Sequence, residues 1–380
     1  MPIGSGPDEV RKVKQSRPTS PLGEPRAIIW PTIWAARWCG SNFPVVNLSV
    51  IFPPAGWAAA NLAISGQSST VAGTDRTTAI AVDASDPGRC EHTKGKDMSD
   101  TTSIAMAQRA FWNSEATRRW VTEQTRIDRL MADVTEAALT AAAPKAGESI
   151  LDIGCGTGTT TLRLADAVGP SGQVLGVDIS EQQLGLARQR VAAAGATRVQ
   201  LVLDDAATHD FAPESFDLGF TRFGVMFFAH PVAAFRNIKR AMKRDGRLLL
   251  TVFRTGQENP WATASAAAIR HLVPPPAPLG PEEPGQFSWS DPARVRRILD
   301  GAGFSNVVLT PLDLSFNLGA DAAEAAEFAT FIGQGARLLH GVSNETRQAA
   351  GVAFREFFKQ HEGSNGVSLP GGLWLVSARA

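Results

Sequence analysis

The stretch Ile150-Leu-Asp-Ile-Gly-Cys-Gly-Thr-Gly158 decides how the rest of the chain is interpreted. Its apolar start predicts a buried strand, three glycines follow at alternate positions, and residues 159–168 have the pattern of a helix. Glycine lets the backbone turn tightly, and it lets a ligand approach main-chain N–H groups with no Cβ in between. The stretch therefore predicts a ligand-binding turn between a strand and a helix.

Three carboxylates stand at the ends of predicted strands. Asp178 follows the strand expected over 173–177, where it can accept hydrogen bonds from both hydroxyls of a ribose. Asp205, with Ala206, follows the strand expected over 198–203 and can accept from an adenine amino group. Asp152 comes directly before the glycines and suits a cationic amino-acid moiety better than a pyrophosphate. Ligands of such sheets bind beyond the carboxyl ends of the strands, so we expect the three aspartates to face one pocket.

The glycine spacing separates two kinds of nucleotide-binding protein. A dinucleotide fingerprint requires G-x-G-x-x-G. Here the third glycine comes one residue early, and Thr159 stands in the dehydrogenase position. The spacing therefore disfavours a NAD-dependent oxidoreductase, which we keep as an alternative.

Strands and helices alternate along the chain after residue 148. Strands are predicted over 149–153, 173–177, 198–203, 216–221 and 247–253, the last after a turn at Asp245-Gly246, and helices over 159–168, 181–194 and 231–242. Such alternation predicts right-handed crossovers and a parallel sheet with helices on both faces. Further helices are predicted over 100–142, 260–272, 291–302, 322–339 and 346–360, and strands over 305–316 and 373–378.

Composition excludes several classes of partner. Lys plus Arg and Asp plus Glu are each 37 in 380 residues, and this balance argues against a nucleic-acid-binding protein, which usually has a basic excess. The longest uncharged run, residues 38–74, is broken by Pro44, Pro53 and Pro54, so it does not fit a membrane-spanning helix. Three cysteines cannot build a disulfide framework, so we expect a reducing compartment, the cytoplasm.

Residues 1–97 differ from the rest of the chain. They contain three leucines and ten prolines, whereas residues 98–380 contain 26 leucines. A stretch with many prolines and no sustained helical or strand periodicity cannot bury enough apolar side chains to offset the entropy of ordering it. Two interpretations remain: a disordered N-terminal extension, or a spurious one with the natural start at Met98. We favour the second, with 98–380 as the working domain.

Residues 150–253 resemble a class I S-adenosylmethionine-dependent methyltransferase. The matching pieces are LDIGCGTG (151–158), LGVDIS (175–180), LDDA (203–206), FDLGFTRFGVMFF (216–228) and MKRDGRLLLTVF (242–253). The chain is most similar to the bacterial small-molecule group related to ubiquinone/menaquinone C-methyltransferases. The segments FWN (111–113) and ENPW (258–261) resemble one branch of that group.

The resemblance implies an α/β fold, a Rossmann-like, seven-stranded, doubly wound sheet. Its strand order would be 3-2-1-4-5-7-6, with the last strand antiparallel. The cofactor-binding core would span 145–254. Helical cap insertions that select the acceptor would come from segments 100–142, 255–290 and 320–362.

The resemblance also implies the cofactor S-adenosylmethionine, with S-adenosylhomocysteine as the product. The glycine turn would hold the methionine end, Asp178 the ribose, and Asp205 with Ala206 the adenine. The full set of implied cofactor-binding residues is Asp152, Gly154, Gly156, Gly158, Asp178, Ile179, Asp205, Ala206 and Thr221.

Four aromatic residues and one methionine are the candidates for an acceptor pocket. Trp112, Phe223, Met226, Phe227 and Trp261 either line an apolar acceptor pocket or only pack the cap. Arg222-Phe-Gly-Val stands where methyltransferases that act on DNA bases or amide nitrogens often have Asn/Asp-Pro-Pro-aromatic, so methylation at carbon or oxygen is expected. The catalytic residue is unknown. His230 can serve as a general base, although the simpler interpretation is a residue at the start of a helix.

The sequence thus predicts a cytoplasmic methyltransferase that acts on a small organic acceptor by in-line displacement. It predicts no metal, nucleic acid or membrane partner, and a monomer or homodimer. A non-catalytic module that binds S-adenosylmethionine is a further alternative.

Overall fold

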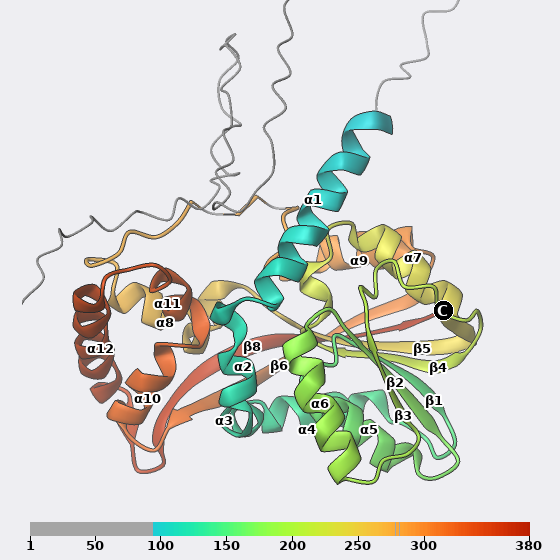
Figure 1. Cartoon of the computed structure of the whole chain (residues 1–380), viewed down its shortest axis with the longest axis horizontal. Helices are drawn as coiled ribbons and strands as arrows, with labels where there is room; N and C mark the ends of the chain where they lie inside the picture. Colours follow the sequence, from blue (N-terminus) through green and yellow to red (C-terminus); the bar gives the residue numbers. More distant parts are fainter. Residues whose placement is uncertain (1–93, 278, 281) are drawn as a thin grey trace, which may run out of the picture. The chain divides into compact units, whose positions relative to one another are not determined.

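The computed structural model describes residues 94–277, 279–280 and 282–380 (Figure 1). The expected N-terminal extension over 1–97 lies outside the described residues except for its last four, which belong to helix α1 (Lys94–Trp112). No helix in the described part of the chain is long and apolar enough to cross a membrane.

One mixed sheet forms the centre of the described residues. Its strands are β1 (Ser149–Ile153), β2 (Gln173–Asp178), β3 (Val199–Leu203), β4 (Phe216–Arg222), β5 (Met242–Phe253), β6 (Ser305–Gly319), β7 (Glu362–Gly363) and β8 (Gly366–Arg379). The order is β3-β2-β1-β4-β5-β8-β6, with the two-residue β7 paired to β8. Strands β1 to β5 run parallel, and β8 is antiparallel to both β5 and β6. Because β7 lies off this path, β8 is the seventh strand of the predicted order, which is confirmed.

Helices cover both faces of the sheet, as predicted. Helices α4 (Ala132–Ala142), α5 (Thr159–Val168) and α6 (Glu181–Ala193) lie on one face, and α7 (Pro231–Ala241) and α9 (Pro292–Gly301) on the other (Figure 1). Alternate residues of the strands point to opposite faces. Ile150 therefore packs with Leu164 of α5, while Leu151 belongs to the core that contains Phe235 of α7.

The predicted strand boundary at Asp245-Gly246 is wrong. The structure continues β5 back to Met242, which pairs with Phe216, and the register shifts before Leu218. Asp245 has a φ of +63°, so the strand is distorted there without ending. Residues 243–246 have no partner in the β4–β5 register, and regular pairing resumes at Arg247, where the strand was predicted to begin.

The single helix predicted over 100–142 is also wrong. The segment forms α1, a 3-10 turn (Glu115–Thr117), α2 (Arg119–Thr122), α3 (Gln124–Leu130) and α4. The Thr117 hydroxyl donates to the carbonyl oxygens of Trp112 (3.0 Å) and Ser114 (3.0 Å), and such side-chain bonds compete with the helical ladder. The predicted apolar face is largely confirmed, since Ile127, Leu130, Met131, Val134 and Ala138 are buried.

The remaining helices lie after β5 and between β6 and β8. They are α8 (Pro260–Ala268), preceded by a 3-10 turn (Gly256–Glu258), and α10 (Ala322–Ala329), α11 (Gly333–Leu338) and α12 (Asn344–Lys359). The helix predicted over 322–339 is split in two, and Gly333 at the break has a φ of +79°.

The three expected cap segments contact one another. Arg126 of α3 forms ion pairs with Glu324 (3.6 Å) and Glu327 (3.3 Å) of α10. Its guanidinium also lies 4.7 Å from the centroid of the Phe328 ring. The Ser265 hydroxyl of α8 accepts a hydrogen bond from the Gly335 N–H of α11 (3.0 Å).

Candidate cofactor site

The glycine turn has the backbone that its sequence predicts. Gly154, Gly156 and Gly158 have φ values of +69°, +56° and +83°, a region that side chains with a Cβ rarely adopt. Gly158 is also the N-cap of α5. The turn therefore presents bare backbone at the end of β1, while its Gly154 and Gly158 N–H groups donate to the carbonyl oxygens of Val177 (2.8 Å) and Cys155 (3.0 Å).

The loop after β4 supports this turn. A Cβ built on Gly154 would lie 2.7 Å from the Cα of Gly224, so only two glycines can pack this closely. The buried Thr221 hydroxyl donates to the Ile153 carbonyl (2.6 Å) and accepts from the Gly224 N–H (3.1 Å). Thr221 thus links β1 to the loop after β4 through its hydroxyl. A direct contact between Thr221 and the cofactor stays a prediction.

Asp178 lies at the end of β2, next to the glycine turn. Its Oδ2 accepts a hydrogen bond from the Gly156 N–H (2.8 Å), and its Oδ1 accepts from the Ser180 N–H (2.8 Å). Burial raises the pKa of Asp178, and these backbone N–H groups oppose the rise. A carboxylate offers about four acceptor positions. Each oxygen therefore keeps a free lone pair, which fits the two hydroxyls of a ribose.

Asp152 is wholly buried at the end of β1. Its Oδ2 accepts hydrogen bonds from the hydroxyls of Thr160 (2.8 Å) and Thr161 (2.7 Å). Its Oδ1 has no partner among the described residues. Burial raises the pKa of Asp152 to about 6. A buried carboxylate oxygen without a donor fits a cationic ligand group, because such a group would supply the missing partner.

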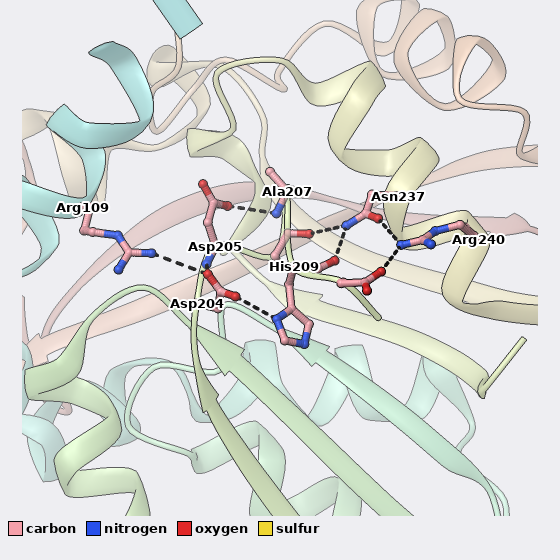
Figure 2. Close-up of polar contacts among 9 residues, drawn as sticks. Arg109, Asp204, Asp205, Ala207, His209, Asn237 and Arg240 are labelled. Atoms are coloured by element: carbon pink, nitrogen blue, oxygen red, sulfur yellow. Dashed lines mark hydrogen bonds and ion pairs between the residues drawn. The ribbon is translucent and has the colours of Figure 1, made fainter. Parts of the chain in front are cut away.

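The predicted adenine end lies after β3 (Figure 2). Asp205 Oδ1 accepts from the Ala207 N–H (2.9 Å). The amide of Asn237, on α7, donates to the carbonyl oxygens of His209 (2.8 Å) and Ala206 (3.4 Å), so α7 fixes the turn that carries Asp205.

The neighbouring Asp204 has different partners. Its carboxylate contacts His209 Nδ1 (2.8 Å) and lies 3.7 Å from the Arg109 guanidinium of α1 (Figure 2). The bond to His209 lowers the pKa of Asp204 despite some burial. The Asp204 carboxylate is thus already engaged by His209 and Arg109. The Asp205 carboxylate accepts only one local backbone hydrogen bond, so one of its oxygens is available to a ligand.

A cavity of about 400 Å³ opens beside these residues. It lies between α1 and the ends of β2 and β3, and its walls include Met106, Asn113, Ile179 and Leu203. Ile179 directly follows Asp178, so an apolar side chain lies beside the predicted ribose and adenine positions.

The end of α1 is bonded to the loop that follows Asp178. Asn113 donates to the Ile179 carbonyl (3.0 Å) and accepts from the Glu181 N–H (2.9 Å), while the Ser180 hydroxyl donates to the Trp112 carbonyl (2.8 Å). Asn113 and Ser180 were not predicted as site residues. The FWN segment resembles the family, but the residue that Asn113 contacts, Ile179, lies 66 positions further along the chain.

The predicted acceptor residues fall into two groups. Trp112 and Phe227, in the 3-10 turn Val225–Phe227, are half-buried and meet edge to face at 5.2 Å between ring centroids. Met226 and Trp261 are buried, with Trp261 stacked on Phe316 at 4.6 Å. Phe223, with a φ of +71°, stacks on Phe253 at 4.1 Å. The first pair lies closest to the Asn113 contact; the others pack into the core of the described residues.

His230 and Cys155 are two further side chains with possible chemistry. His230 is exposed and is the N-cap residue of α7, as the simpler interpretation expects; a role as general base stays a prediction. Cys155 is buried between two of the glycines, and burial raises the pKa of its thiol, which fits packing. Among the described residues, no group of His, Cys, Asp and Glu could hold a metal ion.

Comparisons with known proteins agree with this geometry. A family model described as "Methyltransferase domain" matches residues 144–283. The demethylmenaquinone methyltransferase of Lactobacillus johnsonii is 31% identical over 188 residues, which cover 47% of this chain and 75% of that protein. Aklanonic acid methyltransferase DauC of a Streptomyces species is 32% identical over 163 residues, which cover 42% and 71%.

One solved structure is that of Haemonchus contortus phosphoethanolamine N-methyltransferase 2 in complex with S-adenosyl-L-methionine. It is 19% identical, has a TM-score of 0.41, and covers 65% of this chain and 52% of its own.

The fold and the site together define a methyltransferase with a Rossmann-like sheet. The chain belongs to the class I S-adenosylmethionine-dependent methyltransferases, in the part of the family related to quinone methyltransferases. This membership disfavours the NAD-dependent alternative. The cofactor is S-adenosylmethionine, and the orphaned Asp152 oxygen and the bare glycine turn fit it.

Proposed function

We propose that the protein methylates a small organic acceptor at carbon or oxygen. The relatives above are named for demethylmenaquinone and for aklanonic acid. The edge-to-face pair of Trp112 and Phe227 supports an apolar acceptor, because it brings two aromatic rings to the site from separate segments.

The cofactor-binding residues have separate tasks in this proposal. Gly154, Gly156 and Gly158 let the methionine end approach the bare backbone of the turn, and Asp152 faces its ammonium group. Asp178 binds the ribose hydroxyls. Asp205 and Ala206 bind the adenine, with Ile179 against its face. The sulfonium of the bound cofactor makes the methyl carbon electrophilic.

The remaining task of the chain is to align the acceptor and exclude water. Good alignment supplies about 7–11 kcal/mol of the barrier to a bimolecular step. Segments 100–142, 255–290 and 320–362 form the cap that does this, around a core at 145–254 within 98–380. No dedicated base is needed for an acidic acceptor; for a less acidic one, His230 is the proposed base.

We infer that the enzyme works in the cytoplasm, as a monomer or homodimer, without nucleic-acid or membrane partners. Light scattering of the purified protein, and its distribution after cell fractionation, test these statements.

The observation that carries the proposal is the Asp152–Asp178 pair around the glycine turn. The test is an acceptor screen that measures S-adenosylhomocysteine formation with quinols, phenols and aromatic acids. Asp178→Ala, run in parallel, should remove the signal. Turnover only with peptides or nucleic acids would contradict the small-molecule acceptor.

A further inference from the structure

Arg222 is a cation without a close counter-ion. It ends β4 at the same edge of the sheet as the glycine turn, and its side chain is half-buried. Burial lowers the pKa of Arg222. Within the described part of the chain it forms no ion pair, and its Nη1 donates one hydrogen bond, to the Thr135 hydroxyl of α4 (2.6 Å). A guanidinium has five N–H donors. Most of its donors therefore have no partner in the described structure.

The nearby carboxylate that could pair with Arg222 is already occupied. Asp128 of α3 accepts from the Arg190 guanidinium (3.0 Å) and from the Thr159 hydroxyl (2.6 Å). Its charge still raises the pKa of Arg222, but Asp128 lies beyond ion-pair distance of that side chain. Asp128 is thus already paired with Arg190 and not with Arg222.

Asp152 lies close to Arg222 and lacks a hydrogen-bond donor, whereas Arg222 lacks acceptors. In the β1–β4 register Asp152 is the partner of Phe220, and Arg222 comes two residues later, on the same face of the sheet. The register thus brings the two side chains near one another, and the Arg222 charge lowers the pKa of Asp152 accordingly. They do not form an ion pair, and Asp152 Oδ1 has no partner in the described structure.

A wholly buried carboxylate and a half-buried guanidinium that are close but not paired carry an unfavourable desolvation cost. An α-amino acid group would supply both missing partners, because it has an ammonium donor and a carboxylate acceptor on one carbon. We propose that Asp152 and Arg222 form a two-sided site for the amino-acid end of the cofactor, with Arg222 binding its carboxylate. This inference rests on the cofactor-binding roles proposed above.

The competing use of Arg222 is to bind an anionic group of the acceptor. The position of its side chain argues against that use. Its bonded partner, Thr135, lies on α4, and the two carboxylates that raise its pKa, Asp128 and Asp152, accept hydrogen bonds from threonines at the start of α5. The Trp112–Phe227 pair lies at the other predicted end of the site, beside the Asn113 contact.

The test measures binding by calorimetry with three ligands: S-adenosylhomocysteine, its decarboxylated analogue, and 5′-methylthioadenosine, which lacks the amino-acid end. Arg222→Met should weaken S-adenosylhomocysteine at least tenfold and change the other two less than twofold. Arg222→Lys should recover part of the loss, because it restores the charge without the planar fork. Arg163→Met is the matched control, since Arg163 is an exposed arginine on α5 paired with Glu136, and it should change nothing.

Two results would overturn the inference. One is an equal loss for all three ligands, which would mean a structural role for Arg222. The other is unchanged S-adenosylhomocysteine binding with a raised KM for the acceptor, which would assign Arg222 to the acceptor. If Arg222→Met does not fold, Arg222→Lys is compared with wild type instead. The criterion is again whether S-adenosylhomocysteine binding weakens more than binding of the other two ligands. Failure of the wild-type protein to bind any of the three ligands would instead remove the proposed cofactor roles themselves.

Discussion

Gly154 and Gly224 pack backbone against backbone, and this contact joins the glycine turn to the loop after β4. Neither residue can carry a Cβ without moving the other. The cofactor turn and the segment that leads to the predicted acceptor residues are therefore one rigid unit.

Gly224→Ala should disturb both stability and cofactor binding. Gly224 has a φ of −74°, which alanine adopts freely, but its new Cβ would lie 2.5 Å from the Ile153 carbonyl oxygen. Overpacking of this kind costs about 1–3 kcal/mol. We expect a loss of that size in urea unfolding and weaker binding of S-adenosylhomocysteine. Gly185→Ala in α6 has open space at the Cβ and should be neutral or slightly stabilising; equal effects of the two substitutions would contradict the packing argument.

Asp152 should make the free protein less stable as the pH rises from about 4 to 6. Its pKa is about 6 in the folded state against an ordinary 3.8, so the folded state holds the extra proton in this interval. The unfolding free energy then falls with pH, by up to about 3 kcal/mol. Asp152→Asn should remove this contribution. The measurement is the free energy of unfolding in urea for wild type and variant at pH 4.5 and 7.5. Subtracting the two values at each pH removes the contributions of the other carboxylates, which both proteins share.

Cofactor binding should follow the opposite pH course. A cationic group beside Asp152 favours the ionised carboxylate, so affinity should rise as the pH passes through 6 and then level off. Asp152→Asn should bind more weakly above pH 6 and lose this dependence. A variant that is less stable than wild type at pH 7.5, or a wild-type affinity that is flat from pH 5 to 7.5, would contradict the assignment.

Asp178→Ala should weaken S-adenosylhomocysteine binding by at least about 1.5 kcal/mol, the low end for hydrogen bonds to a charged group. The substitution also leaves the Gly156 and Ser180 N–H groups without their acceptor. Calorimetry is the measurement, and Asp166→Ala, at an exposed position on α5, is the control that should bind normally. An affinity unchanged by Asp178→Ala would speak against the ribose site.

Asn113→Asp should weaken cofactor binding roughly three- to tenfold, corresponding to the net value of about 1 kcal/mol for a lost hydrogen bond. Aspartate can accept from the Glu181 N–H but cannot donate to the Ile179 carbonyl. Hydrogen exchange at residues 178–182 should become faster. Glu115→Ala, which removes only an exposed ion pair with Arg118, should leave both quantities unchanged. Faster exchange without weaker binding would separate the α1 contact from the cofactor site.

The strands and helices that bind the cofactor were predictable because their signals are local. The boundaries of β1 and α5 agree with the sequence, since an apolar run and a glycine turn mark them. The first half of β8 was not predictable. It contains Pro370, Gly371 and Gly372, which normally interrupt a strand, and it is held by pairing with β6. Gly371 is needed because the Phe316 ring occupies the space of a Cβ.

The site shows the same division. The positions of Asp152 and Asp178 follow from strand ends, because parallel strands finish at one edge. Arg222 and Asn113 depend on contacts with residues 87 and 66 positions away, respectively. No periodicity or local spacing reveals such contacts.

The bonds from Asn113 and Trp112 to the loop after Asp178 have a thermodynamic consequence that works in both directions. Cofactor that orders this loop also secures the end of α1, and whatever secures α1 favours the loop conformation that cofactor requires. By linkage, the two events must strengthen each other by the same factor. Helix α1 is therefore a point from which affinity for S-adenosylmethionine can be tuned through the conformation of a loop.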